Sequence, residues 1–384
     1  MIEVNIVGGG ISGLALGFFA KRAGLKFTIH EANNRCGGVI STEKTVIGDI
    51  HHGPHLVRLS PELEEVLHFL SVKTLISQKN GRFLLKNGKI CKISPNFIQF
   101  CEIFISIFRK RKRDYASLGA FVRHHFGKTT ANVQTQALVN GIFACNIDDL
   151  HETALKIIYF TEKRGIYAIL RRFLAKNRGN RQKKQIIRPN GGFQSLIDAL
   201  VEDLRENIVL CSKIRRIDKN VYNFITIPAY CVADVDGIPE KIAKMCEKIR
   251  YQTLSVATIF TTTPINIDGI GCLSNNLDGV LGVLFNSSAF EEKYISYSIF
   301  YKNWTKSQVE EWFVSVFCVE IVKSHHFEYK NAIPLYNQAV CDLIAVNRGN
   351  TRIFSNYSGQ ISLSDIFTNA KNEISRILHE KTHF

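Results

Sequence analysis

The stretch that decides the fold is Glu3–Gly38, EVNIVGGGISGLALGFFAKRAGLKFTIHEANNRCGG, near the start of a chain of 384 residues. Its first apolar run, Glu3–Val7, is typical of a buried parallel strand. A glycine turn follows, and then a segment with helical periodicity that continues through Arg22. A second apolar run, Phe27–His30, ends in the acidic residue Glu31. A unit that binds a dinucleotide has this order of elements: strand, glycine turn, helix, strand and acidic residue.

The three glycines of Gly8-x-Gly10-x-x-Gly13 each have a physical role. Gly8 permits the tight turn, Gly10 lets the backbone approach a pyrophosphate, and Gly13 lets the helix pack closely on the strand. The N-terminus of that helix supplies free N–H groups and the positive end of a dipole. Glu31 can accept hydrogen bonds from a ribose hydroxyl. These four residues predict a cofactor site in an α/β, Rossmann-like domain.

The motif continues as Glu31-Ala32-x-x-Arg35-x-Gly37-Gly38. This extension resembles flavoproteins of the amine oxidase type, in which the glycine pair runs beneath the diphosphate and ribityl chain. An NAD dehydrogenase has no need of a second glycine turn at this place. The resemblance therefore implies FAD as the cofactor, with Arg35, Gly37 and Gly38 also beside it.

Two later segments resemble the returns of such chains to the nucleotide domain. Residues 188–217 are expected to form a glycine turn, an amphipathic helix and a strand that contains Ile214, and a further short strand is expected within 223–232. Residues 352–377 are expected to form a strand, a glycine loop and a helix. We predict FAD-binding segments at 1–80, 188–234 and 335–384, a helical substrate and membrane-associated region at 81–187, and a mixed-sheet substrate domain at 235–334.

Seven blocks in order resemble the protoporphyrinogen oxidase family. They are HHGPHLV (51–57), GRFLLKNGKI (81–90), GAFVRHHFG (119–127), ALVNGIFACNIDDL (137–150), DGVLGVLFNSSAF (278–290), NAIPLYN (331–337) and SNYSGQISLSD (355–365). The resemblance implies an FAD-binding Rossmann-like domain interleaved with a substrate domain. It also implies oxidation of protoporphyrinogen or coproporphyrinogen in haem synthesis, with oxygen as the electron acceptor and no catalytic side-chain dyad.

Matching the family's motifs residue by residue adds further site residues. The positions expected beside the cofactor are Gly53, Pro54, Ile214, Asn356, Ile361 and Ser362. Arg82 stands where the family has an arginine that pairs with a substrate propionate, since a guanidinium donates two parallel hydrogen bonds to a carboxylate. Phe290 stands where an aromatic side chain packs on the tetrapyrrole. The alternatives are that Arg82 is an ordinary surface cation and Phe290 part of the core.

Three features depart from the family pattern. Ser355 stands where a glycine is favoured next to the pyrophosphate, Cys145 replaces a glycine expected beside the substrate, and the chain is shorter than typical relatives. These departures keep two alternatives open: another FAD-dependent oxidoreductase of the amine oxidase type, and a relative that binds FAD without turnover.

Composition and charge narrow the choice of partners. The net charge is +15 and the pI near 9.3, which favours polyanions, but RRM, KH, helix-turn-helix and zinc motifs are absent, so we expect no nucleic-acid partner. The ten cysteines form no CxxC pair, so we expect no metal site and a reducing cytoplasm. His51, His52 and His55 are expected near the flavin edge. The pairs His124–His125 and His325–His326 are expected at the surface.

The stretch FIQFCEIFISIFRKRKR, residues 97–113, joins a mostly apolar segment to five cations. A spanning helix needs about 20 apolar residues, so this segment is too short. As a helix it would place Phe97, Cys101 and Phe104 on one face and Gln99, Glu102 and Ser106 on the other. Two readings remain: peripheral contact with a cytoplasmic membrane face, or a packed helix with a solvated basic end. An oligomer is also compatible with the sequence.

Overall fold

The structure, a computed structural model, describes residues 2–79, 81–86, 88–92, 97–107, 114–154, 185–290 and 294–382. The chain divides into two compact units, each assembled from separated segments. The first contains Met1–Ile76, Lys183–Ile249 and Ala339–Phe384, and the second contains Ser77–Gln182 and Arg250–Gln338. The predicted fold class, a Rossmann-like domain interleaved with a mixed-sheet domain, is confirmed. The membrane-associated character of the helical region stays a prediction.

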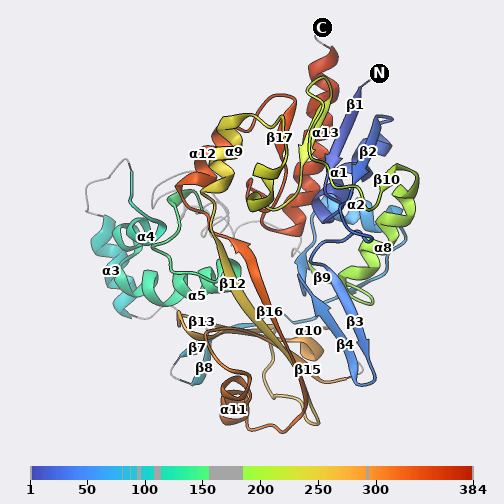
Figure 1. Cartoon of the computed structure of the whole chain (residues 1–384). Helices are drawn as coiled ribbons and strands as arrows, with labels where there is room; N and C mark the ends of the chain where they lie inside the picture. The colour runs from blue at the N-terminus through green and yellow to red at the C-terminus, as the bar shows by residue number, and fades with distance from the viewer. Residues whose placement is uncertain are drawn as a thin grey trace. The chain divides into compact units, whose positions relative to one another are not determined.

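The first unit is built on a parallel sheet of five strands in the order β10-β2-β1-β11-β17 (Figure 1). Its strands are β1 (Glu3–Val7), β2 (Lys26–His30), β10 (Ile208–Val209), β11 (Tyr222–Ile225) and β17 (Thr351–Ile353). Its helices are α1 (Ile11–Arg22), α2 (Pro61–Phe69), α8 (Phe193–Leu204), α9 (Glu240–Glu247), α12 (Gln338–Val346) and α13 (Leu363–Thr382). A hairpin of β3 (Ser41–Thr45) and β4 (Gly48–His52) and a sheet of β5 (Val57–Arg58), β9 (Ile186–Pro189) and β6 (Thr74–Ile76) complete it.

Buried apolar side chains hold the helices of this unit on the parallel sheet. α1 packs beside both α8 and α13, which bring segments from the middle and the end of the chain to its start (Figure 1). Ile6 of β1 and Ile29 of β2 are fully buried, and Leu196 and Leu200 of α8 join the same core. The apolar face of the amphipathic helix predicted within residues 188–217 is thus the face that packs.

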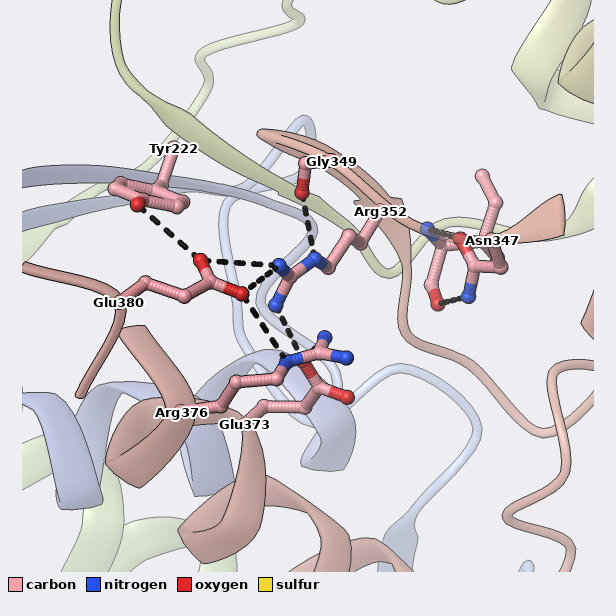
Figure 2. A network of polar contacts seen from close by, with 8 residues as sticks. Tyr222, Asn347, Gly349, Arg352, Glu373, Arg376 and Glu380 are labelled. Carbon is pink, nitrogen blue, oxygen red and sulfur yellow. Dashed lines mark hydrogen bonds and ion pairs between the residues drawn. The ribbon is translucent and has the colours of Figure 1, made fainter. Parts of the chain in front are cut away.

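A buried arginine ties β17 to α13, as Figure 2 shows. The Arg352 guanidinium donates to the Gly349 carbonyl at 2.6 Å, to Glu373 Oε2 at 2.9 Å and to Glu380 Oε1 at 3.1 Å. Tyr222 Oη on β11 donates to Glu380 at 3.4 Å, so two strands share the helix as a partner. This network fixes the long helix that begins directly after the loop at 355–362.

The second unit contains a mixed sheet of seven strands in the order β16-β12-β15-β14-β13-β7-β8. These are β7 (Arg82–Lys86), β8 (Lys89–Lys92), β12 (Tyr251–Thr261), β13 (Gly271–Ser274), β14 (Gly279–Phe285), β15 (Ser296–Lys302) and β16 (Ile321–Pro334). β7 and β8, which hold most of the block at 81–90, pair as antiparallel strands. The helical segments are α3 (Phe97–Ile107), α4 (Leu118–Phe126), a π-helical turn (Thr130–Thr135), α5 (Gln136–Phe143), α10 (Asn286–Phe290) and α11 (Lys306–Phe317).

α3 has its polar side turned toward the protein. Gln99 and Ser106 are each 3% exposed, and Glu102 accepts a hydrogen bond from the Thr129 N–H at 2.9 Å. Phe97 is 81% exposed and Phe104 57% exposed. The two faces predicted from the sequence are present, but the apolar face points outward. None of the described helices is long and apolar enough to cross a membrane.

The surface position expected for both histidine pairs is wrong for His125 and for the side chain of His326, which are buried, while His124 and His325 are half-buried. His125 is 6% exposed and lies 2.9 Å from Tyr115 Oη through its Nε2. The His326 side chain is 4% exposed and lies between Glu310 Oε1 at 3.0 Å and Tyr301 Oη at 3.1 Å. Pairing with buried polar partners offsets the cost of removing each imidazole from water.

Candidate dinucleotide site

The predicted glycine turn follows β1 at the carboxyl edge of the parallel sheet. Gly8 has φ +113°, and its N–H donates to the His30 carbonyl at 2.8 Å. A Cβ on Gly13 would lie 2.0 Å from the Gly8 carbonyl oxygen, so α1 approaches the turn more closely than any side chain permits. The Thr226 hydroxyl donates to the Val7 and Gly8 carbonyls, each at 2.9 Å. Sequence reasoning missed Thr226, although its place directly after β11 was a usable signal.

Gly10 precedes the first residue of α1 and has the conformation of an N-cap. A Cβ built on it would meet no atom of the described chain within 4 Å. Open space at the N-terminus of a twelve-residue helix suits a phosphate group, because the N–H groups of the first turn and the helix dipole both favour an anion. Gly10 therefore fits its predicted role beside a pyrophosphate.

Glu31 is 7% exposed and holds the glycine turn as well as its own loop. Its Oε2 accepts from the Gly9 N–H at 2.8 Å, and its Oε1 accepts from the Asn33 backbone N–H at 2.9 Å and side-chain amide at 2.7 Å. A carboxylate oxygen has lone pairs for a further donor, so a ribose hydroxyl fits the same group.

The second glycine turn lies directly beside the first. The Gly37 N–H donates to the Gly9 carbonyl at 2.9 Å, and Gly37 pairs with Gly10 as a parallel bridge. Gly37 and Gly38 have φ of +107° and +60°, a region that favours glycine. Arg35, predicted to touch the cofactor, donates to the carbonyls of Cys36 at 3.1 Å, Ile40 at 3.3 Å and Gly38 at 2.7 Å. The structure thus shows Arg35 holding this turn in shape.

Cys36 packs beneath the glycine turn and is 6% exposed. A Cβ on Gly9 would lie 2.7 Å from its Sγ. Burial, with Glu31 as a second cause, raises the pKa of the Cys36 thiol to about 11. The thiol therefore stays protonated at neutral pH and acts as a packing group rather than a nucleophile.

Ile214 does not lie in a strand, which corrects the prediction. β10 ends at Val209, and the chain then bends because Cys211 and Ser212 donate their N–H groups to the Asn33 and Glu31 carbonyls at 3.0 and 2.8 Å. Ile214 follows this bend and is half-buried. The bend keeps the segment next to Glu31, on the side of the sheet edge where the ribose is expected.

The C-terminal site residues lie in the loop between β17 and α13. Asn356 and Ile361 are half-buried. The Ser362 hydroxyl accepts from the Asp365 N–H at 3.2 Å and donates to its carboxylate at 2.6 Å, as at a helix start. Ser355, predicted to crowd the cofactor, is 7% exposed, and its N–H donates to Ser358 Oγ at 2.9 Å. That bond closes the turn at 355–358, and Tyr357 Oη anchors it to the Ile227 carbonyl at 2.9 Å.

Gly53 and Pro54 are half-buried, and Gly53 lies beside the residues that follow the second glycine turn. Gly53 has φ +85°, and a Cβ there would lie 3.3 Å from Ile40 Cγ1. Burial, with Arg188 as the second cause, lowers the pKa of His51 to about 4, and burial, followed by His51 and Arg188, lowers the pKa of His55 to about 3. All of these residues belong to the first unit.

The two predicted substrate residues both lie in the second unit. Arg82 begins β7, is exposed, and pairs in register with Gly271, which in turn pairs with Leu284 of β14. Phe290 ends α10, the helix that follows β14, and is 4% exposed. The sheet therefore brings both residues to one of its ends. Their roles at a substrate stay predictions.

Cys145 is 5% exposed, and burial raises the pKa of its thiol to about 12. The Ala144 carbonyl beside it accepts from Lys302 Nζ, which also donates to Gln252 Oε1 at 2.6 Å. Gln136 and Asn140 hold this turn against the sheet, because Gln136 Nε2 donates to the Cys145 carbonyl at 2.8 Å and Asn140 Nδ2 to the Ser274 carbonyl at 2.7 Å. Cys145 is thus enclosed in a tightly bonded turn.

Comparison with known proteins agrees with this geometry. Residues 6–71 match the family of NAD(P)-binding Rossmann-like domains. The chain is 26% identical over 259 residues to protoporphyrinogen oxidase 2 of Arabidopsis thaliana, covering 57% of this chain and 51% of that protein. It is 28% identical over 245 residues to coproporphyrinogen III oxidase of Bacillus subtilis, covering 54% and 51%. These matches span about half the length of each relative.

The fold is also that of solved amine oxidases. The cyclohexylamine oxidase of Brevibacterium oxydans superposes with a TM-score of 0.73 over the whole of both chains at 15% identity. The Rossmann match and the glycine cradle both fit the expected dinucleotide site, and the fold is one shared with solved amine oxidases. Over about half of its length the chain is therefore similar to proteins named protoporphyrinogen oxidase and coproporphyrinogen III oxidase, and it has the fold of solved amine oxidases.

Proposed function

We propose that this chain is an FAD-dependent oxidase that converts a porphyrinogen, protoporphyrinogen or coproporphyrinogen, to the porphyrin in haem biosynthesis. One observation carries the proposal: proteins similar to it from a yeast, two plants and a bacterium are named protoporphyrinogen oxidase or coproporphyrinogen III oxidase. The cradle of Gly10, Glu31 and Gly37 supports it, since those residues fit a dinucleotide.

In this proposal a bound FAD would supply the acceptor for the hydrides that the substrate loses. The substrate loses six electrons in total, its protons pass to solvent, and oxygen is reduced to hydrogen peroxide. The chain's own residues bind and orient. Glu31 holds the ribose, the N-terminus of α1 holds the pyrophosphate, and Arg82 and Phe290 are the residues proposed for the propionate and the ring.

The test is an anaerobic mixture of flavin-loaded protein with each porphyrinogen, exposed to oxygen and followed by porphyrin fluorescence. We expect formation well above autoxidation for one of the two substrates. Arg82→Met should raise KM about tenfold with little change in kcat, because it removes a contact made equally in the ground and transition states. Lys89→Met, at an exposed cation on the neighbouring strand β8, is the matched control. Protein that holds flavin but leaves both porphyrinogens at the autoxidation rate would contradict the proposal.

A second candidate is an amine oxidase activity, favoured by the full-length superposition on cyclohexylamine oxidase. Hydrogen peroxide release from a panel of primary amines and polyamines, with no porphyrin formation, would establish it. A protein that binds FAD and oxidises neither class would correspond to a relative without turnover, for which the replacements at Ser355 and Cys145 give a reason.

We further propose that α3 rests on an anionic membrane surface near which a poorly soluble substrate is found. Its outward face carries four large apolar side chains exposed by 57–81%, namely Phe97, Ile98, Phe104 and Ile105. A helix whose apolar side faces water costs free energy unless another phase covers it. The five cations at 109–113 follow directly in the sequence and lie outside the described residues; each would contribute ~1 kcal/mol near anionic headgroups.

Co-sedimentation with vesicles tests this docking. We expect binding to vesicles that contain phosphatidylserine, and a loss of at least tenfold on Phe104→Ser with Ile105→Ser. The control is Val46→Ser, at an apolar residue 86% exposed in the other unit, which should leave binding unchanged. Replacing the five cations with glutamine should also weaken binding. Equal vesicle binding by all variants would refute the proposal.

A further inference from the structure

His51, His52, His55 and Arg188 form a basic cluster inside the dinucleotide unit. His51 and His52 are the last two residues of β4. His55 follows Gly53 and Pro54, and Arg188 lies on β9. His55 is 6% exposed and Arg188 3% exposed. His51 Nδ1 lies 3.1 Å from Thr42 Oγ1 and occupies the space a side chain at Gly192 would need, since a Cβ there would be 2.4 Å away. Glycine at 192 thus admits the imidazole.

The neighbours of its residues place this cluster beside the second glycine turn of the cradle. Glu31 marks the ribose end, and the turn at Gly8–Gly10 with the N-terminus of α1 marks the pyrophosphate. Gly37 bridges to Gly10, and a Cβ on Gly53 would lie against Ile40 and Val39, which follow the second glycine turn. Arg35, which holds that turn, also acts electrostatically on His52. The cluster therefore lies beside the second glycine turn, which itself pairs with the turn expected at the pyrophosphate.

The electrostatics of the cluster favour an anion. Within the part of the chain that the structure describes, the charged groups that shift the pKa of His51 or His55 are all basic, namely Arg188 and the neighbouring histidines. At His52, burial and Arg35 lower the pKa, and Glu43 raises it. A permanent guanidinium charge in a buried position acts strongly on a nearby negative charge, because protein screens it less than water.

We propose that this cluster stabilises the negative charge that the flavin ring gains when it accepts a hydride, with Arg188 as the main source of positive charge. The inference rests on the proposed FAD-dependent function. The hydride carries two electrons from a substrate C–H bond to the ring, and the substrate cation then releases a proton to solvent. The ring is left with one net negative charge, and the cluster lowers the free energy of that state. Arg188 and the histidines are positioning groups that act through space.

Sulfite is a direct probe, because it adds to the ring of a bound flavin and leaves the same negative charge there. We expect flavin-loaded protein to bind sulfite, measured by loss of visible flavin absorbance. Arg188→Met should weaken sulfite binding at least tenfold and lower the reduction potential, tenfold being about 30 mV for a two-electron couple. Arg188→Lys keeps the charge and should retain sulfite affinity within about threefold of the starting protein.

A second variant keeps the proposal testable if Arg188→Met does not fold. His52 is half-buried, so His52→Glu adds a carboxylate to the cluster and should weaken sulfite binding, whereas His52→Gln should not. Arg205→Met removes a cation of the same unit that is 68% exposed on its side chain and serves as the control. Unchanged sulfite affinity and potential in both Arg188→Met and His52→Glu, with FAD bound, would overturn the inference. If the purified protein binds no FAD, that result refutes the proposed FAD-dependent function.

Discussion

Gly10 and Gly13 belong to one motif but have different surroundings. A side chain at Gly13 would collide with backbone, while one at Gly10 would enter open space. Gly13→Ala should therefore lower the free energy of unfolding by at least ~2 kcal/mol, since backbone must move to admit the methyl group. Gly10→Ala should keep the stability of the apoprotein and lose FAD affinity, because the methyl group occupies the space expected for the pyrophosphate.

Thermal unfolding of both apoproteins and titration with FAD distinguish these outcomes. Gly24→Ala is a useful reference, since a Cβ there also meets no atom of the described chain but lies far along the sequence from the turn, and its φ of +68° adds only local strain. A Gly10→Ala variant that binds FAD as tightly as the starting protein would contradict the placement of the pyrophosphate.

The buried imidazole of His55 should make the stability of the folded protein depend on pH. Its pKa in the folded protein is lowered from 6.5 to about 3 by burial and by its basic neighbours. Between these two values the unfolded chain binds a proton that the folded chain does not, so stability falls as pH drops below 6.5. Above pH 6.5 the His55 imidazole is neutral in both states, so the stability that is lost at lower pH is fully present there. His55→Asn should flatten the slope of unfolding free energy between pH 6.5 and 4, as measured in urea at several pH values. An unchanged slope would show that other groups dominate.

Among the elements, α13 depends on one buried side chain of β17. Arg352→Met leaves Glu373 and Glu380 without their buried donor and should cost about 1.5–3 kcal/mol, the range for hydrogen bonds to charged groups. The two carboxylates are partly exposed, so water relieves some of the cost. Arg376→Met removes an arginine 41% exposed on its side chain from the same network and should cost much less. The free energy of unfolding of both variants is measured with denaturant. Equal losses would show that the buried contacts of Arg352 are not what stabilises α13.

α3 shows how an element's periodicity leaves its orientation open. The sequence separates Phe97 and Phe104 from Gln99 and Ser106 at helical spacing, and the structure keeps that separation. The polar face packs inward because its side chains form hydrogen bonds there. The Thr129 N–H donates to the Glu102 carboxylate, and Gln134 Nε2 donates to Gln99 Oε1. A pattern of apolar residues does not show these hydrogen-bond partners, because the partners lie in segments distant along the chain.

At the scale of the molecule, the cofactor should stabilise the fold. FAD at about one hundred times its dissociation constant adds ~2.7 kcal/mol to the free energy of unfolding. For a unit of this size that corresponds to a rise in Tm of roughly 5–10 °C. NAD at the same concentration is the control, because the second glycine turn is expected for FAD. Purified protein without flavin absorbance whose Tm is indifferent to added FAD would refute a flavin site.

The sequence by itself determined the dinucleotide unit, because each step of that motif is a local requirement. Gly8 needs a positive φ, Gly13 needs close packing, and Glu31 needs only to follow β2. The approach of Arg35 to three carbonyls, the bend that takes Ile214 out of a strand, and the outward face of α3 were decided by tertiary structure. The same is true of the basic cluster, which joins His51 to Arg188, far apart in the sequence. Contacts between distant segments depend on how sheets and helices pack, and no local pattern of residues encodes that packing.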